Sequence, residues 1–106
     1  MVSLDPVQGS EIGKKRPALV ISNDRNNQFA ETVTVIPLTS RTDRPYPFEA
    51  SIKAGTSGLS SESRAKCNQI RTVSRTRLLQ RIGHLSPEEM QHVEKALLIH
   101  LAILLR

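Results

Sequence analysis

Short segments rich in β-branched residues recur along most of the chain and predict a mainly β protein. The two strongest are Ala18–Ile21 and Thr32–Ile36, and each is bounded by proline, asparagine, aspartate or serine, the residue types that end strands. Between them, the polar segment Asn23–Asn27 predicts a turn. Further strands are expected at Val2–Leu4, Phe48–Ile52, Ala65–Val73 and Leu78–Ile82.

One helix is predicted over about residues 86–105. Ser86 supplies an N-cap hydroxyl, Pro87 suits the first helical position, and a glutamate follows where a capping box needs it. Apolar residues then recur at helical spacing, namely Met90, Val93, Leu97, Leu101 and Leu104. Because this apolar surface extends almost all round the helix, we expect it to pack on the sheet and on a second subunit. Several strands followed by one helix predict a small, barrel-like antiparallel sheet.

The size and charge of the chain limit its organisation and its partners. With 106 residues it is expected to form a single domain, residues 1–106. Fifteen basic against ten acidic residues give a net charge of +5, which favours a polyanionic partner, nucleic acid first, although a solvated basic surface explains the same charge. The single cysteine, Cys67, excludes an internal disulfide and a multi-cysteine zinc site, and we interpret it as a structural thiol.

The sequence offers no pattern for a metal, a cofactor or a membrane anchor. His84, His92 and His100 lack second ligands at metal-binding spacing. No charged leader with an apolar core opens the chain. The apolar run 96–105 is too short to span a bilayer. We therefore expect a cytoplasmic protein that binds neither metal nor cofactor and does not associate with membranes.

The segment Gly9–Pro17 is the first candidate for phosphate contacts. Its glycines, its serine and its three consecutive cations suit such contacts, although a flexible basic hairpin would have the same composition. Arg16 differs from the other two cations because it enters a strand, where packing can hold its guanidinium. The candidate residues in this segment are Ser10, Glu11, Lys14, Lys15 and Arg16.

Two further segments could also contact phosphate. Thr39 and Ser40 close a strand with two hydroxyls, a pattern that a simple turn explains equally well. Between residues 64 and 81 the chain carries six cations and no acidic residue, as a surface that follows a phosphodiester backbone would. These cations are Arg64, Lys66, Arg71, Arg75, Arg77 and Arg81. The scarcity of aromatic residues argues against base-stacking platforms.

Taken in order, several segments make the chain resemble the MazF/PemK toxin family over nearly its whole length. The matching segments are Leu4–Pro6 with Gly9–Glu11, Lys15–Ser22, Val33–Ser40, Pro47–Glu49, Gln69–Val73, and Arg77–Leu78 with Ile82–Gly83. The resemblance implies an SH3-like β-barrel with a C-terminal helix, usually a homodimer, that cuts single-stranded RNA at short motifs without metal. It also implies a cognate antitoxin whose disordered tail covers the RNA site.

The resemblance implies roles for individual residues. Arg16 matches the arginine of the family's Arg-Pro strand and Thr39 the threonine of its Thr-Ser strand end, so we expect both to be catalytic, with Glu11 as a candidate base. Ser10 and Glu11 match the loop beside the site, and Gln69 matches the family's Gln-Ile-Arg strand, so RNA contacts are expected from Ser10 and Gln69. Further RNA contacts are expected, from charge or hydroxyl groups rather than from the resemblance, for Lys14, Lys15, Ser40, Arg71 and Arg75. The loop 41–47 is expected to help set base preference.

Two departures and two rival functions qualify this expectation. The opening Met1–Leu4 is shorter than the family's first strand, so the chain is expected to start downstream of the native N-terminus. In addition, Asn68 stands where a carboxylate is common in the family. A toxin of the same fold could instead bind DNA gyrase without catalysis, although the Arg-Pro strand and the Thr-Ser end are features of the ribonuclease branch. An SH3-like module that binds nucleic acid without cleaving it is the other rival.

Overall fold

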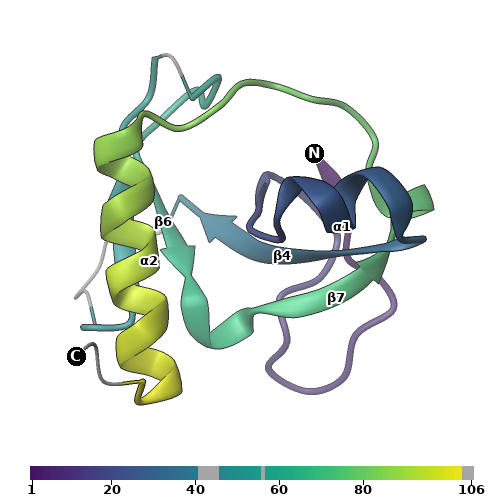
Figure 1. The fold of residues 1–106 in the computed structure, drawn as a ribbon, viewed down its shortest axis with the longest axis horizontal. Helices are drawn as coiled ribbons and strands as arrows, with labels where there is room; N and C mark the ends of the chain where they lie inside the picture. The colour runs from purple at the N-terminus through teal and green to yellow at the C-terminus, as the bar shows by residue number, and fades with distance from the viewer. Residues whose placement is uncertain (41–45, 56, 104–106) are drawn as a thin grey trace.

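The computed structural model describes residues 1–40, 46–55 and 57–103. Its strands are β1 (Val2–Ser3), β2 (Lys15–Arg16), β3 (Ala18–Val20), β4 (Thr32–Thr39), β5 (Glu49–Ile52), β6 (Ser63–Lys66) and β7 (Arg71–Ser74). Its α-helices are α1 (Asp24–Phe29) and α2 (Pro87–Leu101), and two short 3₁₀ turns are η1 (Cys67–Gln69) and η2 (Arg75–Arg77). Figure 1 shows α1 and α2 on different sides of the strands.

The long strand β4 organises the sheet. One edge of β4 pairs with β3, and its other edge pairs first with β7 and then with β6, which in turn pairs with β5. All these pairings are antiparallel, and β1 and β2 form a separate two-stranded sheet. The predicted mainly β fold with a C-terminal helix is therefore confirmed. Within the described residues the strands form two sheets rather than one closed ladder.

Strand β4 contributes to two apolar cores because its side chains alternate between faces. Val33 and Val35 pack with Val2, Leu4 and Val73 on one side. Ile36 and Leu38 face the other side, in a cluster completed by Ala50, Ile52, Leu59, Ala65, Cys67, Val93 and Ala96. One strand thus fixes the position of the N-terminal segment and of α2 together.

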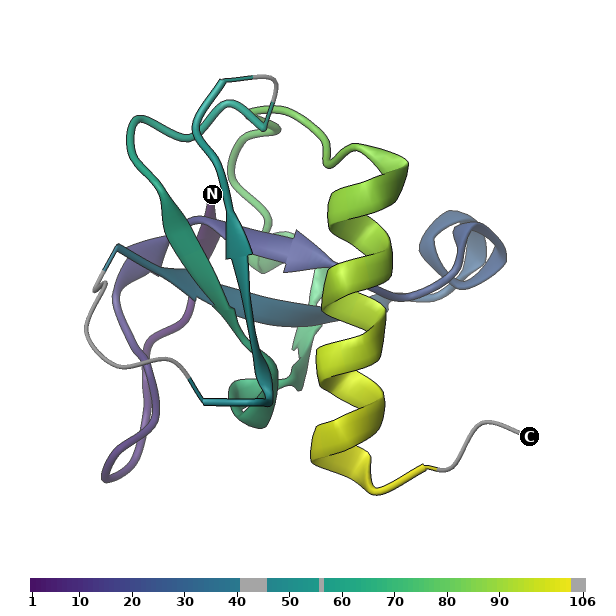
Figure 2. The same cartoon turned by 90° about the vertical axis from the view of Figure 1, so that its left-hand side faces the viewer.

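Helix α2 begins as predicted and ends earlier than predicted. The Ser86 hydroxyl accepts from the Glu89 amide at 3.1 Å, and the Glu89 side chain closes the capping box. The helix ends at Leu101, because Ala102 takes a left-handed conformation with φ 55°. It packs on β5 and η1 (Figure 2). Of the predicted apolar face, Leu104 lies outside the described residues. No helix in the described ranges is long and apolar enough to cross a bilayer.

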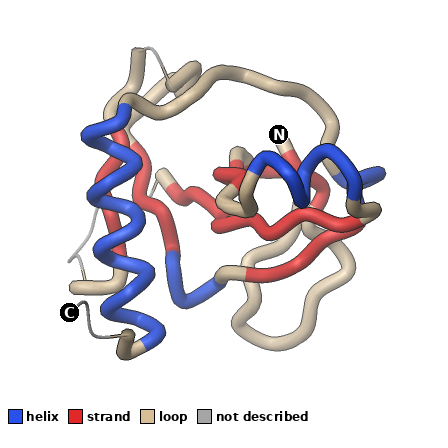
Figure 3. The backbone as a smooth tube through the Cα atoms, in the orientation of Figure 1, coloured by secondary structure: helices blue, strands red, loops and turns tan. Residues whose placement is uncertain are grey.

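Three local predictions are wrong. The segment predicted as a turn at Asn23–Asn27 begins helix α1, because the Asn23 side chain caps it by accepting from the Asn26 amide. The predicted strand Leu78–Ile82 makes only one bridge, between Val2 and Leu78, and lies in a loop (Figure 3). The predicted strand Ala65–Val73 is interrupted by η1. The chain bends there, so that β6 and β7 are separate strands that pair with different parts of β4.

Candidate functional site

An open cleft of about 720 Å³ lies over the polar face of β4, β5 and β6. It is lined by Ser10, Ile12, Arg16, Thr39, Ser40, Tyr46, Glu49, Arg64, Lys66, Asn68 and Gln69. A second cavity of about 370 Å³ adjoins it and shares Arg16 and Ser40 as lining residues. An extended ligand could run through both cavities. Arg16 and Ser40 would then lie at its middle, because they line both.

Strand register explains why these polar side chains meet. Leu38 lies opposite Ala65, and Thr39 lies opposite Arg64. Glu49 lies opposite Lys66 on the next pair of strands. Because alternate side chains point to opposite faces, the apolar members of each strand enter the core beneath α2 and the polar members face the cleft.

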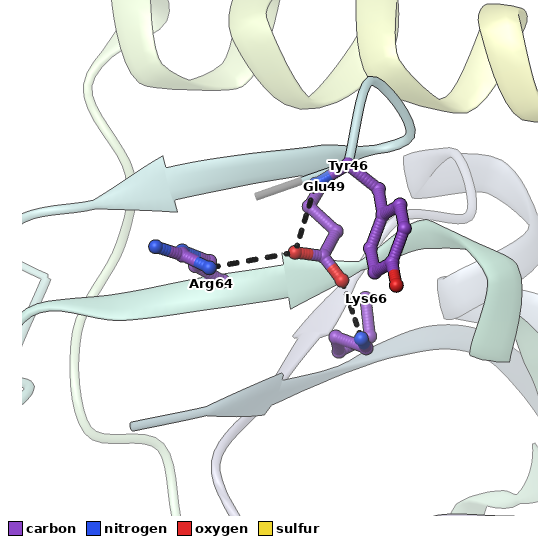
Figure 4. Close-up of polar contacts among 4 residues, drawn as sticks. All are labelled: Tyr46, Glu49, Arg64 and Lys66. Atoms are coloured by element: carbon purple, nitrogen blue, oxygen red, sulfur yellow. Dashed lines mark hydrogen bonds and ion pairs between the residues drawn. The ribbon is translucent and has the colours of Figure 1, made fainter. Parts of the chain in front are cut away.

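The cleft contains a buried carboxylate between two cations (Figure 4). The Glu49 side chain is only 3% exposed, and its Oε2 accepts a hydrogen bond from the Lys66 Nζ. Its Oε1 lies 3.7 Å from an Arg64 guanidinium nitrogen and accepts from the Tyr46 amide at 3.4 Å. Among the described residues, two positive charges face one negative charge in this part of the cleft, which suits an anionic ligand.

The loop 8–14 holds the guanidinium of Arg16. The Arg16 Nε donates to the Gly13 carbonyl at 2.8 Å. On the other side of that peptide, the Lys14 amide donates to Asp5 Oδ1 at 2.8 Å. A Cβ at Gly13 would lie 2.5 Å from the same Asp5 oxygen, so a larger residue would displace the loop. Arg16 is therefore oriented by backbone geometry and retains its other nitrogens for a ligand.

The backbone of Ile12 is held at both its amide and its carbonyl by the Gln-Ile-Arg segment. Gln69 Oε1 accepts from the Ile12 amide at 3.3 Å. A guanidinium nitrogen of Arg71 donates to the Ile12 carbonyl. The Arg71 Nε is buried and has no hydrogen-bond partner among the described residues. Arg71 thus contacts the loop that carries the cleft wall, and it does not itself line the cleft.

The structure brings half of the predicted site residues together. Ser10, Arg16, Thr39, Ser40 and Gln69 line the cleft. The others, Glu11, Lys14, Lys15, Arg71 and Arg75, are not among its lining residues. The Glu11 carboxylate accepts from the Gln8 amide at 2.7 Å, within its own loop. Arg75 is exposed on η2.

Sequence reasoning assigned no role to Glu49, and it included Tyr46 only within the loop 41–47 that is expected to help set base preference. For Glu49 the only signal was its place in the segment Pro47–Glu49, which carried the family resemblance. Tyr46 lines the cleft and is 54% exposed. Its ring stacks on the ring of Phe48, with the two ring centroids 5.2 Å apart. The role of Glu49 depends on the pairing of β5 with β6, which a sequence does not display.

Cys67 has the properties of a core residue, as predicted. It is fully buried in η1, and its Sγ lies 3.9 Å from the Val93 carbonyl of α2. Burial, together with the charge of Glu49, raises the pKa of the thiol to about 11. A thiol that stays protonated at neutral pH is a poor nucleophile. In the described ranges, no three histidine, cysteine or acidic residues are grouped as a metal site would require.

The small antiparallel β fold presents an arginine, hydroxyls and two further cations around an open cleft, a set of donors that suits anionic groups such as phosphate. Residues 1–101 match the model of the PemK-like, MazF-like toxins of type II toxin–antitoxin systems. The chain belongs to this family.

Individual relatives agree with that assignment. The chain is 42% identical over 105 residues to Endoribonuclease MazF9 of Mycobacterium tuberculosis, covering 94% of this chain and 89% of that protein. It superposes on MazF from Deinococcus radiodurans (form I) with a TM-score of 0.82 at 27% identity, covering 96% of this chain and 90% of the other. A MazE–MazF structure from the same organism (form III) gives a TM-score of 0.71 at 26% identity, covering 85% and 88%.

Proposed function

We propose that this chain is an endoribonuclease toxin that cuts single-stranded RNA at specific sequences, without metal, and so inhibits translation and growth. The observation that carries the proposal is Arg16, oriented by Gly13 at the junction of two cavities beside Thr39 and Ser40. A fixed guanidinium is well suited to the charge that develops on a phosphate during transfer. The 42% identity to a protein named as an endoribonuclease supports the same conclusion.

The proposed reaction is an internal transfer on the RNA backbone. The ribose 2′-hydroxyl loses its proton and its oxygen attacks the adjacent phosphorus. The bond to the 5′-oxygen of the next nucleotide breaks, and that oxygen takes up a proton. The products are a 2′,3′-cyclic phosphate and a 5′-hydroxyl. Arg16 stabilises the negative charge on the phosphate oxygens, and Thr39 holds one of them by a hydrogen bond. Glu11 stays the candidate base.

RNA contacts follow from the walls of the cleft. Ser10, Ser40 and Gln69 line it, which supports our proposal that they contact RNA on either side of the scissile phosphate. Lys14, Lys15, Arg71 and Arg75 do not line it, and we propose for them a weaker contribution through long-range charge. The loop 41–47, expected to set base preference, lies mostly outside the described residues.

The proposed partners are a cognate antitoxin and a second copy of the chain in the cytoplasm. The family model is that of toxins from toxin–antitoxin systems, so a disordered antitoxin tail with acidic and apolar residues would complement the basic cleft. A symmetric homodimer is expected to have its contacts near Leu97, Leu101 and Leu104. Leu101 is 47% exposed, as are its neighbours Ile99 and Ile103 at 48% and 51%, whereas Leu97 packs partly against the core and Leu104 lies outside the described residues. Light scattering at micromolar concentration tests the dimer.

One assay tests the reaction and both rival functions. The purified protein is incubated with single-stranded RNA in excess EDTA, and the fragment ends are then identified. Cleavage that leaves 5′-hydroxyl ends is expected. Fragments with 5′-phosphates, or cleavage only after addition of magnesium, would contradict the chemistry. Intact RNA, with inhibition of gyrase supercoiling in a parallel assay, would identify the gyrase-binding alternative. Binding without cleavage would identify the inactive module.

A further inference from the structure

Glu49 is the only acidic residue among those lining the cleft in the described part of the chain. Burying a carboxylate costs free energy unless it is paired, and here both of its oxygens are engaged. The two partners of this ion pair differ in exposure: the Glu49 side chain is 3% exposed, whereas the Lys66 side chain is 24% exposed. A ligand in the cleft can therefore reach the cation but not the anion.

We propose that Glu49 is a positioning residue for RNA binding and that it acts through Lys66. The carboxylate holds the ammonium at the wall of the cleft, where Lys66 contacts a phosphate beside the scissile one. An ammonium has three N–H donors, and the hydrogen bond to Glu49 uses one of them. Arg64 contributes less to this arrangement, since its nearest nitrogen is 3.7 Å from the carboxylate, beyond hydrogen-bond distance. The inference rests on the proposed function.

Two other roles for Glu49 differ from the proposed one, and the first conflicts with the geometry while the second predicts the opposite effect on RNA affinity. A general base must come within hydrogen-bond reach of the 2′-hydroxyl, which a carboxylate that is 3% exposed and has both oxygens engaged does not offer. A merely repulsive charge would weaken RNA binding, so its removal would strengthen binding. A positioning role predicts the opposite sign, because without the carboxylate the two cations on one face of β6 repel each other and Lys66 loses its fixed position.

The sign of the effect on affinity provides the test. An RNA that the wild type cuts is made uncleavable with a 2′-deoxy nucleotide at the mapped position, and its dissociation constant is measured. Glu49→Gln should raise this constant about twofold to tenfold, which is the range expected when a flexible side chain must be ordered on binding. Glu62→Gln removes an equal charge at an exposed position and should leave the constant unchanged.

A double-mutant cycle tests whether Glu49 acts through Lys66. Lys66→Ala should weaken binding at least as much as Glu49→Gln and should lower the salt slope of the affinity by about 0.7, the value for one phosphate contact on single strands. In the Lys66→Ala background, Glu49→Gln should have no further effect. An undiminished effect in that background would show that Glu49 does not act through Lys66.

The remaining outcomes are also decisive. If the wild type cuts no RNA, the proposed function fails. If the wild type cuts RNA but Glu49→Gln binds as tightly as the wild type or more tightly, only this inference is wrong. Loss of turnover at saturating RNA, together with loss of the acidic limb of the pH–rate profile, would make Glu49 the base and overturn it. If Glu49→Gln does not fold, Lys66→Ala must still weaken binding more than Lys95→Ala on the exposed side of α2.

Discussion

Five of the six cations between residues 64 and 81 form two groups in different parts of the fold, and the sixth, Arg71, contacts the backbone of Ile12. The cleft cations, Arg64 and Lys66, lie on β6 with side chains 12% and 24% exposed, against the buried carboxylate of Glu49. The outer cations, Arg75, Arg77 and Arg81, follow β7 and lie away from the lining of the cleft. Arg77 donates to the carbonyl of Asp5 and so ties the N-terminal segment to η2.

The difference shows that charge along a sequence does not identify a site. Both groups belong to one uninterrupted basic segment, but η1 turns the chain between them and β4 pairs with a different strand on each side of that turn. The Arg64 and Lys66 side chains on β6 therefore share a face with Thr39, whereas Arg77 of η2 contacts the N-terminal segment. Long-range attraction depends on all of these charges, but contact with a bound phosphate is expected only in the cleft.

The largest expected effect concerns Arg16, a third cation of the cleft. Arg16→Ala should lower the single-turnover rate at saturating protein by about 10²–10³, because it removes the group proposed to stabilise transition-state charge. Affinity for the uncleavable RNA should change much less. If Arg16→Ala and Arg75→Ala reduce rate and affinity in the same proportion, Arg16 is one phosphate contact among several and the catalytic assignment is wrong.

The next effect concerns the chain of contacts behind Arg16. Arg71→Met removes the donor to Ile12 while keeping an unbranched side chain, so the loop that orients Arg16 should shift. Misplacement of a catalytic group by about 1 Å can cost up to about 10² in rate, and we expect a loss of about 10-fold to 10²-fold with affinity nearly retained. Equal losses of rate and affinity would instead show that Arg71 contacts RNA directly.

A smaller effect is expected from the outer cations. Arg75→Ala should weaken RNA binding by no more than about threefold, with normal turnover at saturating RNA, since Arg75 is exposed and lies outside the cleft. Titrations at several salt concentrations measure this. A loss of affinity equal to that of Lys66→Ala would remove the distinction between cleft and outer cations.

The smallest effect concerns the stability of the protein and involves Cys67, the residue after Lys66. It is absent at neutral pH and is expected only as the pH becomes alkaline. Because the pKa of Cys67 in the folded protein is raised to about 11 from an ordinary value of 9.0, its contribution to stability is complete below pH 9 and is lost as the pH rises through 11. Urea unfolding should therefore show wild type losing more stability than Cys67→Ala between pH 8 and pH 10.5. Parallel losses in the two proteins would contradict the raised pKa.

Local signals predicted the parts of the fold that local chemistry determines. The capping box at Ser86 and the β-branched residues of β3 and β4 specify their elements without tertiary help. Helix α1 was missed because it has only six residues, none of them buried, so it lacks an apolar face to detect. The segment Leu78–Ile82 has the composition of a strand, but beyond the bridge at Leu78 it makes no strand pairing in the described structure.

The candidate site could be predicted only in part, because some of its contacts depend on strand pairing and on residues far apart in the sequence. Arg16 and Thr39 were found because they belong to segments that resemble a known family, and both line the cleft. Glu49 gained a role only when β5 paired with β6 and placed it opposite Lys66. Arg71 was predicted to bind RNA from its charge, whereas its guanidinium contacts a main-chain carbonyl 59 positions away.

The two contacts on Ile12 have a consequence for redesign of this protein. Gln69 and Arg71 contact only the amide and the carbonyl of that residue, so their hold does not depend on the side chains that the loop carries. Exposed positions such as Gln8 and Ser10 could then be randomised to retarget the enzyme while the anchored backbone of Ile12 stays in place. A library that changes the number of residues between Gly9 and Gly13 would lose that anchor, so length should be fixed and identity varied.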